Sequence, residues 1–368
     1  MLGFLTLHPQ AFGLDISDLS LKIVQLEKKQ RGFRLSSVGG GELEQGILEA
    51  GEIKDEDRLV RAIQKTLKQV KGKKIRTNHV VAALPEEKAF VQVVQLPRMR
   101  KEELMSAIRF QAEGYIPYPI DTVYIDFAII PPLHNHTDHL DVLVASLSRQ
   151  VVDSYVSVLQ KAGLVPSVLE IDAVALTRAV IEKGVSPVPL LVIDIGKART
   201  KVSIFSGYSL RFTTSLSISS EQFTQAVAQA LHVDEEKAEE FKRQYGLYEP
   251  EDRLAEEVFG AMVPPATDFI EHITKYLEYY ESHLPHQHLG KEQAKIQKIL
   301  LCGGGANLKG FPEFLMRALK VEVVVGNPWV NILSPNSTEL PMLSFQESLG
   351  YSTALGLALR GAREKELV

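Results

Sequence analysis

The stretch GLDISDLSLKIVQLEKKQRGFRLSSV, residues 13–38, decides the fold. Its apolar runs, interrupted by polar turns near Asp18 and at residues 30–32, predict three consecutive antiparallel strands. The pattern returns at residues 190–216, LLVIDIGKARTKVSIFSGYSLRFTTSL. In each copy an aspartate, Asp15 and then Asp194, stands near the end of the first strand. This repeat of architecture predicts two similar α/β lobes that face each other.

A different pattern lies between the two copies. Apolar residues alternate with polar ones in some segments and recur at helical spacing in others. The expected elements are strands at residues 90–97, 123–129 and 141–147 and helices at 101–115 and 152–163. We expect residues 86–165 to form a small α+β module inserted into the first lobe.

Helices dominate after the second meander. Ser219 and Gln222 fit a capping box at the start of one helix, and a longer helix is expected from about Ala266 to Leu284. Residues 298–302, KILLC, predict a strand that runs into a glycine-rich turn. The glycines at residues 39–41 lack the strand-to-helix context of a nucleotide loop, so we expect them to lie in a loop.

Asp15, Asp194 and the glycines at residues 303–305 together point to nucleotide chemistry. Backbone N–H groups in tight hairpin turns form concave sites for phosphate, and carboxylates orient the waters on a Mg²⁺ ion. Glycine lacks the Cβ that would collide with a nucleotide lying on the backbone. Actin-like proteins hold ATP with this layout, one aspartate coming from each lobe. We therefore expect ATP and Mg²⁺ as cofactors.

Composition narrows the classes of function. A net charge of −5 with 41 basic residues offers no overall basic footprint for nucleic acid. The single cysteine, Cys302, lies in an apolar strand and is expected to be a buried, inert thiol in a reducing compartment. We find no run of about 18 apolar residues, so direct membrane insertion is not expected. The histidine clusters at residues 134–139 and 283–288 are interpreted as solvated loops rather than metal sites.

Several motifs together carry a family resemblance. They are GLDISDLSLKIVQL, FQAEGYIPYPIDTVYIDF from Phe110, EIDAVALTRAV from Glu170, VIDIGKARTKVSIF, AEEFKRQYG, LLCGGGANLKGFPEFL, GNPWVNI from Gly326 and YSTALGLAL. This combination resembles the PilM family of type IV pilus assembly proteins over nearly the whole chain. The resemblance implies an α/β, actin-like two-lobed ATPase fold with ribonuclease H-like lobes and an inserted small α+β subdomain, as in the cell-division protein FtsA.

The resemblance also implies a division into domains. Residues 1–85 and 166–188 would form the first lobe, and residues 86–165 the inserted subdomain. Residues 189–345 would form the second lobe, with a helical subdomain on its nucleotide side. Residues 346–368 would form a closing helix that returns to the first lobe.

The family's phosphate and adenosine motifs imply a set of site residues in this sequence. The nucleotide-binding residues would be Asp15, Ser17, Ser20, Lys22, Asp194, Gly196, Thr200, Gly303, Gly304 and Gly305, with Asp15 and Asp194 holding Mg²⁺ through water. Two departures stand out. Ser17 and Asp18 replace a glycine and a phosphate-facing serine, and Lys197, Arg199 and Lys201 crowd the second loop. These basic residues could neutralise either phosphate or Asp18, and the altered loops predict a weak ATPase at most.

The resemblance implies a scaffold function rather than a metabolic enzyme. The chain would be cytoplasmic, peripheral at the inner membrane through partners, and part of the pilus assembly platform. Its partners would be a PilN-like bitopic membrane protein, the pilus motor ATPases and other copies of itself. The cytoplasmic N-terminal peptide of the PilN-like protein would bind in a groove between the first lobe and the inserted module, between Arg76 and the helix at residues 101–115.

Three alternatives remain open. A phosphotransferase of the sugar and acetate kinase superfamily would share the lobes and would need a general base, for which Asp172 and Glu170 are candidates. An FtsA-like division filament would need an amphipathic membrane-targeting tail, and RGAREKELV at residues 360–368 does not fit one. A platform protein of a related secretion system is the third.

Overall fold

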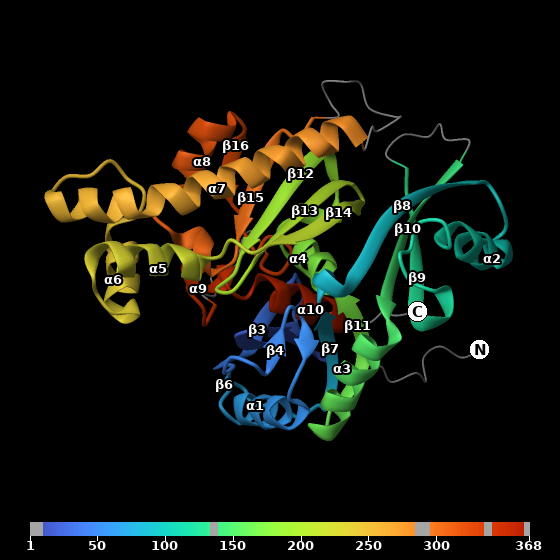
Figure 1. Ribbon diagram of the computed structural model, residues 1–368. Coiled ribbons are helices and arrows are strands. Elements are labelled where there is room, and N and C mark those ends of the chain that lie inside the picture. The colour runs from blue at the N-terminus through green and yellow to red at the C-terminus, as the bar shows by residue number, and fades with distance from the viewer. Residues whose placement is uncertain (1–9, 133–138, 284–294, 335–340, 364–368) are drawn as a thin grey trace.

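The chain folds into two lobes with a third group of strands beside them. The computed structural model describes residues 10–132, 139–283, 295–334 and 341–363. Figure 1 shows the first lobe below, the second lobe above it, and the third group of strands to the right.

The first lobe is built on a six-stranded sheet in the order β11-β7-β1-β2-β3-β6. Strands β1, β2 and β3 are antiparallel neighbours, whereas β7 and β11 run parallel to β1. The predicted first meander is therefore confirmed. The strands are β1 (Phe12–Ser17), β2 (Ser20–Lys28), β3 (Phe33–Glu42), β6 (Lys71–Gly72), β7 (His79–Leu84) and β11 (Val165–Ile171). The hairpin of β4 (Leu48–Glu49) and β5 (Glu52–Ile53) leads into α1 (Glu56–Lys68).

The glycines at residues 39–41 were expected in a loop, and this prediction is wrong, because they lie in β3. Their lack of side chains serves packing. A Cβ on Gly39 would lie 2.8 Å from the Val70 side chain, and one on Gly41 would lie 2.3 Å from the Thr66 hydroxyl of α1. The strand is glycine-rich because a helix lies directly on it.

The second lobe repeats the arrangement of the first. Its five-stranded sheet has the order β14-β13-β12-β15-β16, with β12, β13 and β14 antiparallel and β15 and β16 parallel to β12. The repeat predicted from the sequence is confirmed at the level of strand order. The strands are β12 (Ser186–Ile195), β13 (Thr200–Gly207), β14 (Ser209–Leu216), β15 (Lys298–Cys302) and β16 (Glu322–Val325). The helices are α5 (Ser220–Leu231), α6 (Glu235–Tyr245), α7 (Arg253–His283) and α8 (Phe311–Leu319).

The longest helix, α7, begins earlier than predicted. It starts at Arg253 rather than near Ala266, and Pro264 and Pro265 lie inside it. Proline removes a backbone hydrogen bond inside a helix and usually ends it. A stripe of buried residues nevertheless runs through the prolines at spacings of three and four, so packing outweighs the lost hydrogen bonds. The stripe consists of Val258, Met262, Ala266, Phe269 and Ile273.

The capping box predicted at α5 is absent, although Ser219 is the N-cap residue. No cap hydrogen bond reaches the Ser219 side chain. Instead, the N–H of Ser220 donates to the Gly196 carbonyl at 3.0 Å, and the N–H of Glu221 donates to the Lys197 carbonyl at 3.2 Å. The β12–β13 turn therefore caps the helix, which sequence spacing does not reveal.

The third group of strands forms its own three-stranded sheet, β8-β10-β9. Its elements are β8 (Ala89–Pro97), α2 (Lys101–Ala112), β9 (Val123–Ile130) and β10 (His139–Ser148). A separate small core fills the space between the sheet and α2, made by Val94, Leu96, Leu104, Ile108, Val142 and Val144. This segment has its own sheet and its own core, whereas its assignment to an inserted module over residues 86–165 stays a prediction.

The helix α3 (Arg149–Lys161) belongs to a different core from that of the inserted module. Its residues Tyr155, Val158 and Leu159 are buried with the apolar residues of β1, β7 and α1. The Tyr155 hydroxyl donates to the Gly51 carbonyl of the first lobe at 2.9 Å. The predicted module boundary at residue 165 stays a prediction, and this packing favours an end near Ser148.

Two helices cross between the lobes. Helix α4 (Asp172–Val180) follows a first-lobe strand but packs with Val192, Leu300 and Cys302 of the second sheet. Helix α10 (Ser352–Ala362), preceded by α9 (Phe345–Leu349), follows the second lobe but packs on β1 and β2 of the first. At their crossing a Cβ on Gly356 would lie 1.8 Å from the Ala175 carbonyl oxygen. Only glycine permits this approach.

Some sequence expectations concern segments beyond the described residues. Most of both histidine clusters lies outside them, as do the first nine residues and the last five. Within the described ranges, no three His, Cys, Asp or Glu side chains gather in a way that could hold a metal ion. Among those residues, too, no helix has the length and apolar character needed to cross a membrane. Cys302 is fully buried, and burial raises the pKa of its thiol well above the ordinary value, as the predicted inert thiol requires.

Candidate functional site

A cleft of about 250 Å³ lies where the first strands of the two meanders end. Both hairpin turns reach it, β1–β2 from the first lobe and β12–β13 from the second. The polar residues that line it are Asp15, Ser17, Asp18, Ser20, Lys22, Glu87, Asp172, Asp194, Lys197, Arg199, Lys201, Ser352 and Thr353, together with Gly196, Gly303 and Gly304. The cleft therefore brings together residues from both ends of the chain.

Each lobe places an aspartate beside a lysine in this cleft. In the first lobe Asp15 of β1 is opposite Lys22 of β2, and in the second Asp194 of β12 is opposite Lys201 of β13. Side chains directly opposite each other on antiparallel strands lie close together. Burial raises the pKa of Asp194, and Lys201 opposes this rise. The internal repeat thus extends from strand order to the charged residues.

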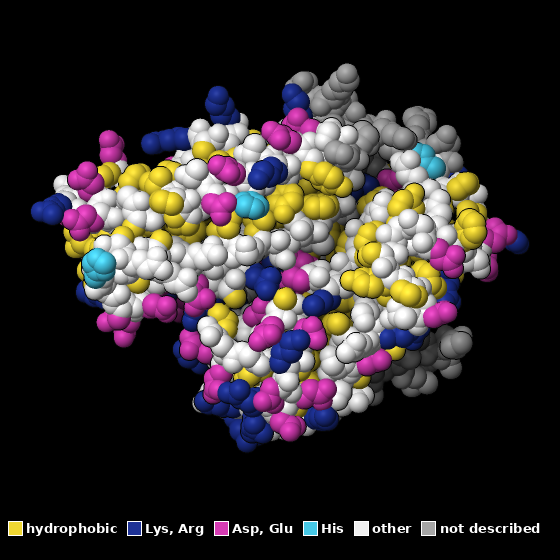
Figure 2. Space-filling view, viewed as in Figure 1, with side chains coloured by type: hydrophobic (Ala, Val, Ile, Leu, Met, Phe, Trp, Pro, Cys, Tyr) yellow, Lys and Arg dark blue, Asp and Glu magenta, His cyan; other side chains and the backbone are white. Residues whose placement is uncertain are grey.

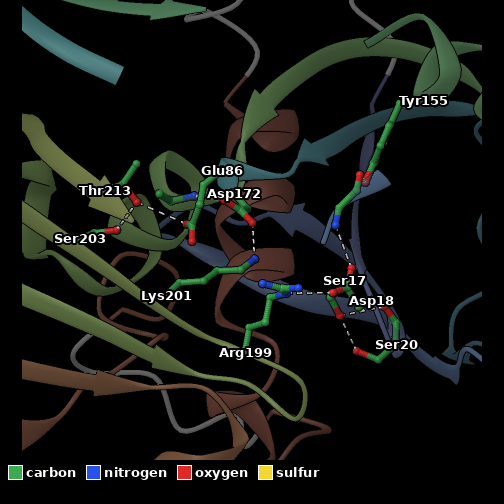
Figure 3. Close-up of polar contacts among 12 residues, drawn as sticks. Ser17, Asp18, Ser20, Glu86, Tyr155, Asp172, Arg199, Lys201, Ser203 and Thr213 are labelled. Atoms are coloured by element: carbon green, nitrogen blue, oxygen red, sulfur yellow. Dashed lines mark hydrogen bonds and ion pairs between the residues drawn. The ribbon is translucent and has the colours of Figure 1, made fainter. Parts of the chain in front are cut away.

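Lys201 makes its ion pair with Asp172, the first residue of α4. Figure 3 shows the two side chains meeting between the lobes. Burial raises the pKa of Asp172 to about 6, although Lys201 draws it down. Burial alone would lower the pKa of Lys201, but the nearby carboxylates, Asp172 foremost, lift it well above its ordinary value. Lys201 is therefore a half-buried cation in the cleft, held by its carboxylate neighbours.

The two hairpin turns are joined by a second ion pair. The Arg199 guanidinium donates to the Asp18 carboxylate at 3.1 Å, as Figure 3 shows. Asp18 also accepts hydrogen bonds from the N–H groups of Ala50 at 3.2 Å and Gly51 at 3.0 Å. Of the two roles foreseen for the basic residues, Arg199 takes the neutralisation of Asp18. The carboxylate that replaces a serine in the first loop thus has a partner.

The serines of the first hairpin turn bind each other. The Ser17 hydroxyl donates to the Ser20 carbonyl at 3.1 Å and lies 2.8 Å from the Ser20 hydroxyl. Both line the cleft, but in this arrangement the turn itself uses much of their hydrogen-bonding capacity. Thr200, the third hydroxyl residue of the predicted set, does not line the cleft. Its Oγ1 is buried without a hydrogen-bond partner among the described residues.

The three glycines after β15 have different roles. Gly303 has a φ of +80°, and a Cβ there would lie 2.3 Å from the Asp194 carboxylate. A Cβ on Gly305, which does not line the cleft, would lie 2.3 Å from the Ile195 side chain. A Cβ on Gly304 would meet nothing within 4 Å. Gly303 and Gly305 therefore allow the backbone after β15 to pack closely against β12. At Gly304, by contrast, the space that a side chain would occupy is empty.

Glu86 and Glu87 were missed by the sequence reasoning. They begin a 3₁₀ turn, Glu86–Lys88, directly after β7, and Glu87 lines the cleft. Burial, with Asp172 nearby, raises the pKa of Glu86 well above its ordinary value. One of its oxygens accepts from Thr213 of the other lobe at 3.3 Å (Figure 3). Their place at the carboxyl end of a parallel strand, where α/β proteins bind ligands, was the available signal.

The two candidate bases of the phosphotransferase alternative differ in position. Asp172 lies in the cleft, where Lys201 engages it. Glu170 lies outside the cleft, where it binds Arg178 at 2.7 Å and Arg360 at 2.6 Å. Both guanidinium groups thus occupy the Glu170 carboxylate away from the cleft. Of the two, only Asp172 is placed to act on a ligand.

The cleft residues fit a magnesium–polyphosphate group. Asp15, Asp172 and Asp194 do not form a cluster that could bind a metal ion directly, but their oxygen atoms line the cleft and suit contacts to the waters of a hydrated Mg²⁺ ion. Lys22 and Lys201 supply positive charge for phosphate. The open side of Gly304 leaves the backbone accessible beside them. Donor chemistry and space therefore agree with the predicted cofactors.

Comparison with known proteins gives consistent relatives. The model of the family described as "Type IV pilus assembly protein PilM" matches residues 13–362. A solved "PilM-PilN type IV pilus biogenesis complex" is similar with a TM-score of 0.77 and 28% identity, covering 97% of this chain and 100% of that one. The cell division protein FtsA of Enterococcus hirae is 25% identical over 340 residues, 84% of this chain and 76% of the relative.

A more distant structure shares the fold alone. MreB5 of Spiroplasma citri bound to ADP has a TM-score of 0.56 and 12% identity, covering 94% of each chain. With these neighbours the predicted actin-like fold is confirmed. The predicted family resemblance is confirmed as well.

Proposed function

Because the chain belongs to the PilM family of type IV pilus assembly proteins, we propose that it is a scaffold that captures the cytoplasmic N-terminal peptide of a PilN-like bitopic membrane protein. One observation carries this proposal, namely the family match over residues 13–362. The similarity to the PilM chain of a PilM–PilN complex along 97% of this chain supports it. Such a peptide would hold the chain at the inner membrane, where pilus motor ATPases and further copies of the chain are its other proposed partners.

The peptide site is proposed between the first lobe and the inserted module. Each side offers an open strand edge among the described residues: β11 at the end of the first sheet and β9 at the end of the module sheet. Apolar side chains are exposed on both, Val165 on β11 and Ile129 on β9. An unpaired edge with apolar neighbours suits the addition of an extended peptide. These two edges would supply the backbone partners for such a peptide.

Titration with the synthetic N-terminal peptide of the neighbouring bitopic protein tests this proposal. Val165→Asp and Ile129→Asp should each weaken binding at least tenfold, because a charge would be buried under the peptide. Tyr248→Asp, at an equally exposed apolar site on the second lobe, is the matched control and should bind normally. Unchanged binding by both edge variants would refute the site, and no binding by the wild type would refute the function.

The same cleft that brings the two lobes together is proposed to bind ATP with Mg²⁺. Asp15, Asp172 and Asp194 would hold the hydrated metal, and Lys22 and Lys201 the phosphates. Bound Mg²⁺ would neutralise phosphate charge. The existing ion pairs in the cleft favour slow turnover at most, since Arg199 and Lys201 are already engaged. The phosphotransferase alternative is disfavoured because Lys201 already engages the Asp172 carboxylate, which would have to accept a proton from the substrate.

Isothermal titration with Mg-ATP tests the nucleotide site. Asp194→Asn should lower the affinity for Mg-ATP at least tenfold. Asp252→Asn changes an exposed helix cap that does not line the cleft, and it should leave this affinity unchanged. Absence of heat with the wild-type protein would remove the nucleotide from the proposal. Capture of the PilN-like peptide is measured separately and would stand without it.

A further inference from the structure

One surface of the first lobe is far more basic than the chain as a whole. Residues 58–85 contain eight Lys or Arg and no Asp or Glu, in a chain whose net charge is −5. The overall charge conceals this cluster, and composition alone therefore gave no sign of it. An uninterrupted run of one sign indicates a surface built for an oppositely charged partner.

The fold gathers these cations on one surface. Helix α1 buries Leu59 and Ile63 toward the core, and Arg61, Lys65 and Lys68 are exposed at spacings of four and three residues. The chain then forms the edge strand β6, which adds Lys71 beside them, and continues through Lys74 and Arg76. Figure 2 shows Lys and Arg side chains gathered at the lower end of the molecule, over α1 and β6. We call these six residues the basic face: Arg61, Lys65, Lys68, Lys71, Lys74 and Arg76.

No ion pair among the described residues neutralises the basic face, and the carboxylate that interacts with it electrostatically is Glu347, near Lys71. All six side chains are exposed, and none forms an ion pair with another residue that the structure describes. Neighbouring Lys73 differs, because Glu27 binds it at 2.7 Å. Like charges held close together without counter-charges repel one another. An anionic surface that covers them removes this repulsion.

The protein surface between these basic side chains is apolar. A shallow hollow beside α1 is lined by Lys68 and Lys74 together with Leu67, Val70 and Ile75. Cations around an apolar surface can bind an amphiphile, because the cations contact its charged headgroup and the apolar side chains contact its hydrocarbon chain. Nucleic acid fits less well, since single strands require aromatic side chains for stacking. The stretch 58–76 contains no aromatic residue.

We propose that the basic face docks on the anionic phospholipid surface of a bilayer. This contact goes beyond the proposed function, because it involves lipid and no partner protein. Each basic residue near such a surface strengthens binding about fivefold, which corresponds to about 1 kcal/mol. Six residues would give weak, salt-sensitive binding that orients the first lobe toward the membrane. A tethered partner peptide would add to it by raising the local concentration.

Co-sedimentation of the full chain with vesicles tests the proposal. Vesicles of phosphatidylcholine with phosphatidylglycerol should bind the protein, and vesicles of phosphatidylcholine alone should not. The variant Lys65→Gln, Lys68→Gln, Lys71→Gln, Lys74→Gln should bind at least a hundredfold more weakly. The control carries the same change in charge at four exposed cations elsewhere, Lys183→Gln, Lys237→Gln, Arg253→Gln and Lys320→Gln, and should bind as the wild type does.

The outcomes separate the possible occupants. Binding to anionic vesicles that is lost in the basic-face variant and in 0.5 M salt supports the proposal. Equal losses in the variant and its control would reduce the effect to net charge and overturn it. Binding to an RNA oligonucleotide or to polyglutamate without binding to anionic vesicles would also overturn it. The vesicles contain no partner protein, so this result is independent of peptide capture.

Discussion

Replacement of Lys201 by methionine should destabilise the protein in a pH-dependent manner. Lys201 is a cation with a side-chain exposure of 17%, paired with Asp172 at 4%. Asp194 lies opposite it in the adjacent strand. Methionine keeps the length of the side chain but removes its charge, so the two buried carboxylates lose their counter-charge. Breaking a buried pair on one side costs about 3 kcal/mol.

The sign of the pH dependence follows from the pKa values. In the wild type burial already raises the pKa of Asp172 to about 6, and without Lys201 it would rise further. A carboxylate whose pKa is higher in the folded state than in the unfolded state binds more protons when folded. Its contribution to stability is therefore lost as the pH rises through the folded pKa. The difference between variant and wild type should be small at pH 5.5 and largest near pH 8.

Thermal unfolding of the full chain at pH 5.5 and pH 8 measures this effect. At roughly 2–4 °C per kcal/mol for a domain of this size, the Tm should fall by about 6–12 °C at pH 8 and by much less at pH 5.5. Addition of Asp172→Asn to the variant should restore part of the Tm at pH 8, because it removes the unpaired carboxylate. Lys237→Met, which breaks an exposed pair, should change little at either pH. Equal losses of Tm at both pH values would refute the assigned electrostatics.

Three further predictions concern other parts of the fold. Asp18→Asn should raise the affinity for Mg-ATP about tenfold in calorimetry, because it removes a carboxylate from the phosphate loop and releases Arg199; unchanged or weaker binding would contradict this. Gly356→Ala should cost about 3 kcal/mol or more, because its Cβ would lie 1.8 Å from a carbonyl oxygen. The control Gly260→Ala lies inside a helix with nothing within 4 Å of the added Cβ and should stabilise the folded protein by up to about 1 kcal/mol. Equal melting curves for the two variants would contradict the close contact of α4 and α10 at Gly356. Cys302 should resist a thiol reagent in the native protein and react after unfolding, since it is buried; rapid native labelling would show that the strand is open.

The sequence predicted the elements whose formation depends on residues close together along the chain. The two meanders were predictable because apolar strands alternate with polar turns, and their repetition predicted that Asp15 and Asp194 would meet at one cleft. The structure places both there, with Ser17, Ser20, Lys22, Gly196, Gly303 and Gly304. Whether these residues hold a nucleotide stays a prediction.

The misses share a cause, which is contact between residues distant in sequence. The longest helix was expected to begin near Ala266, but a continuous buried stripe extends α7 back through Pro264 and Pro265 to Arg253. Ser219 looked like a side-chain cap, but the turn at residues 196–197 supplies the capping carbonyls. Glu86 carried no local sign that burial would raise its pKa. Partners of this kind follow only from the three-dimensional arrangement.

The crossing of α4 and α10 constrains how the lobes can move. Helix α4 packs on strands of both lobes, whereas α10 follows the second lobe and packs on the first, and the two backbones touch at Gly356 and Ala175. If one lobe slid past the other, both helices would lose packing contacts with the sheets. A rotation of the lobes about this contact would preserve the packing of each helix. We therefore expect the two lobes to open and close by a hinge rotation, with the contact at Gly356 as the pivot.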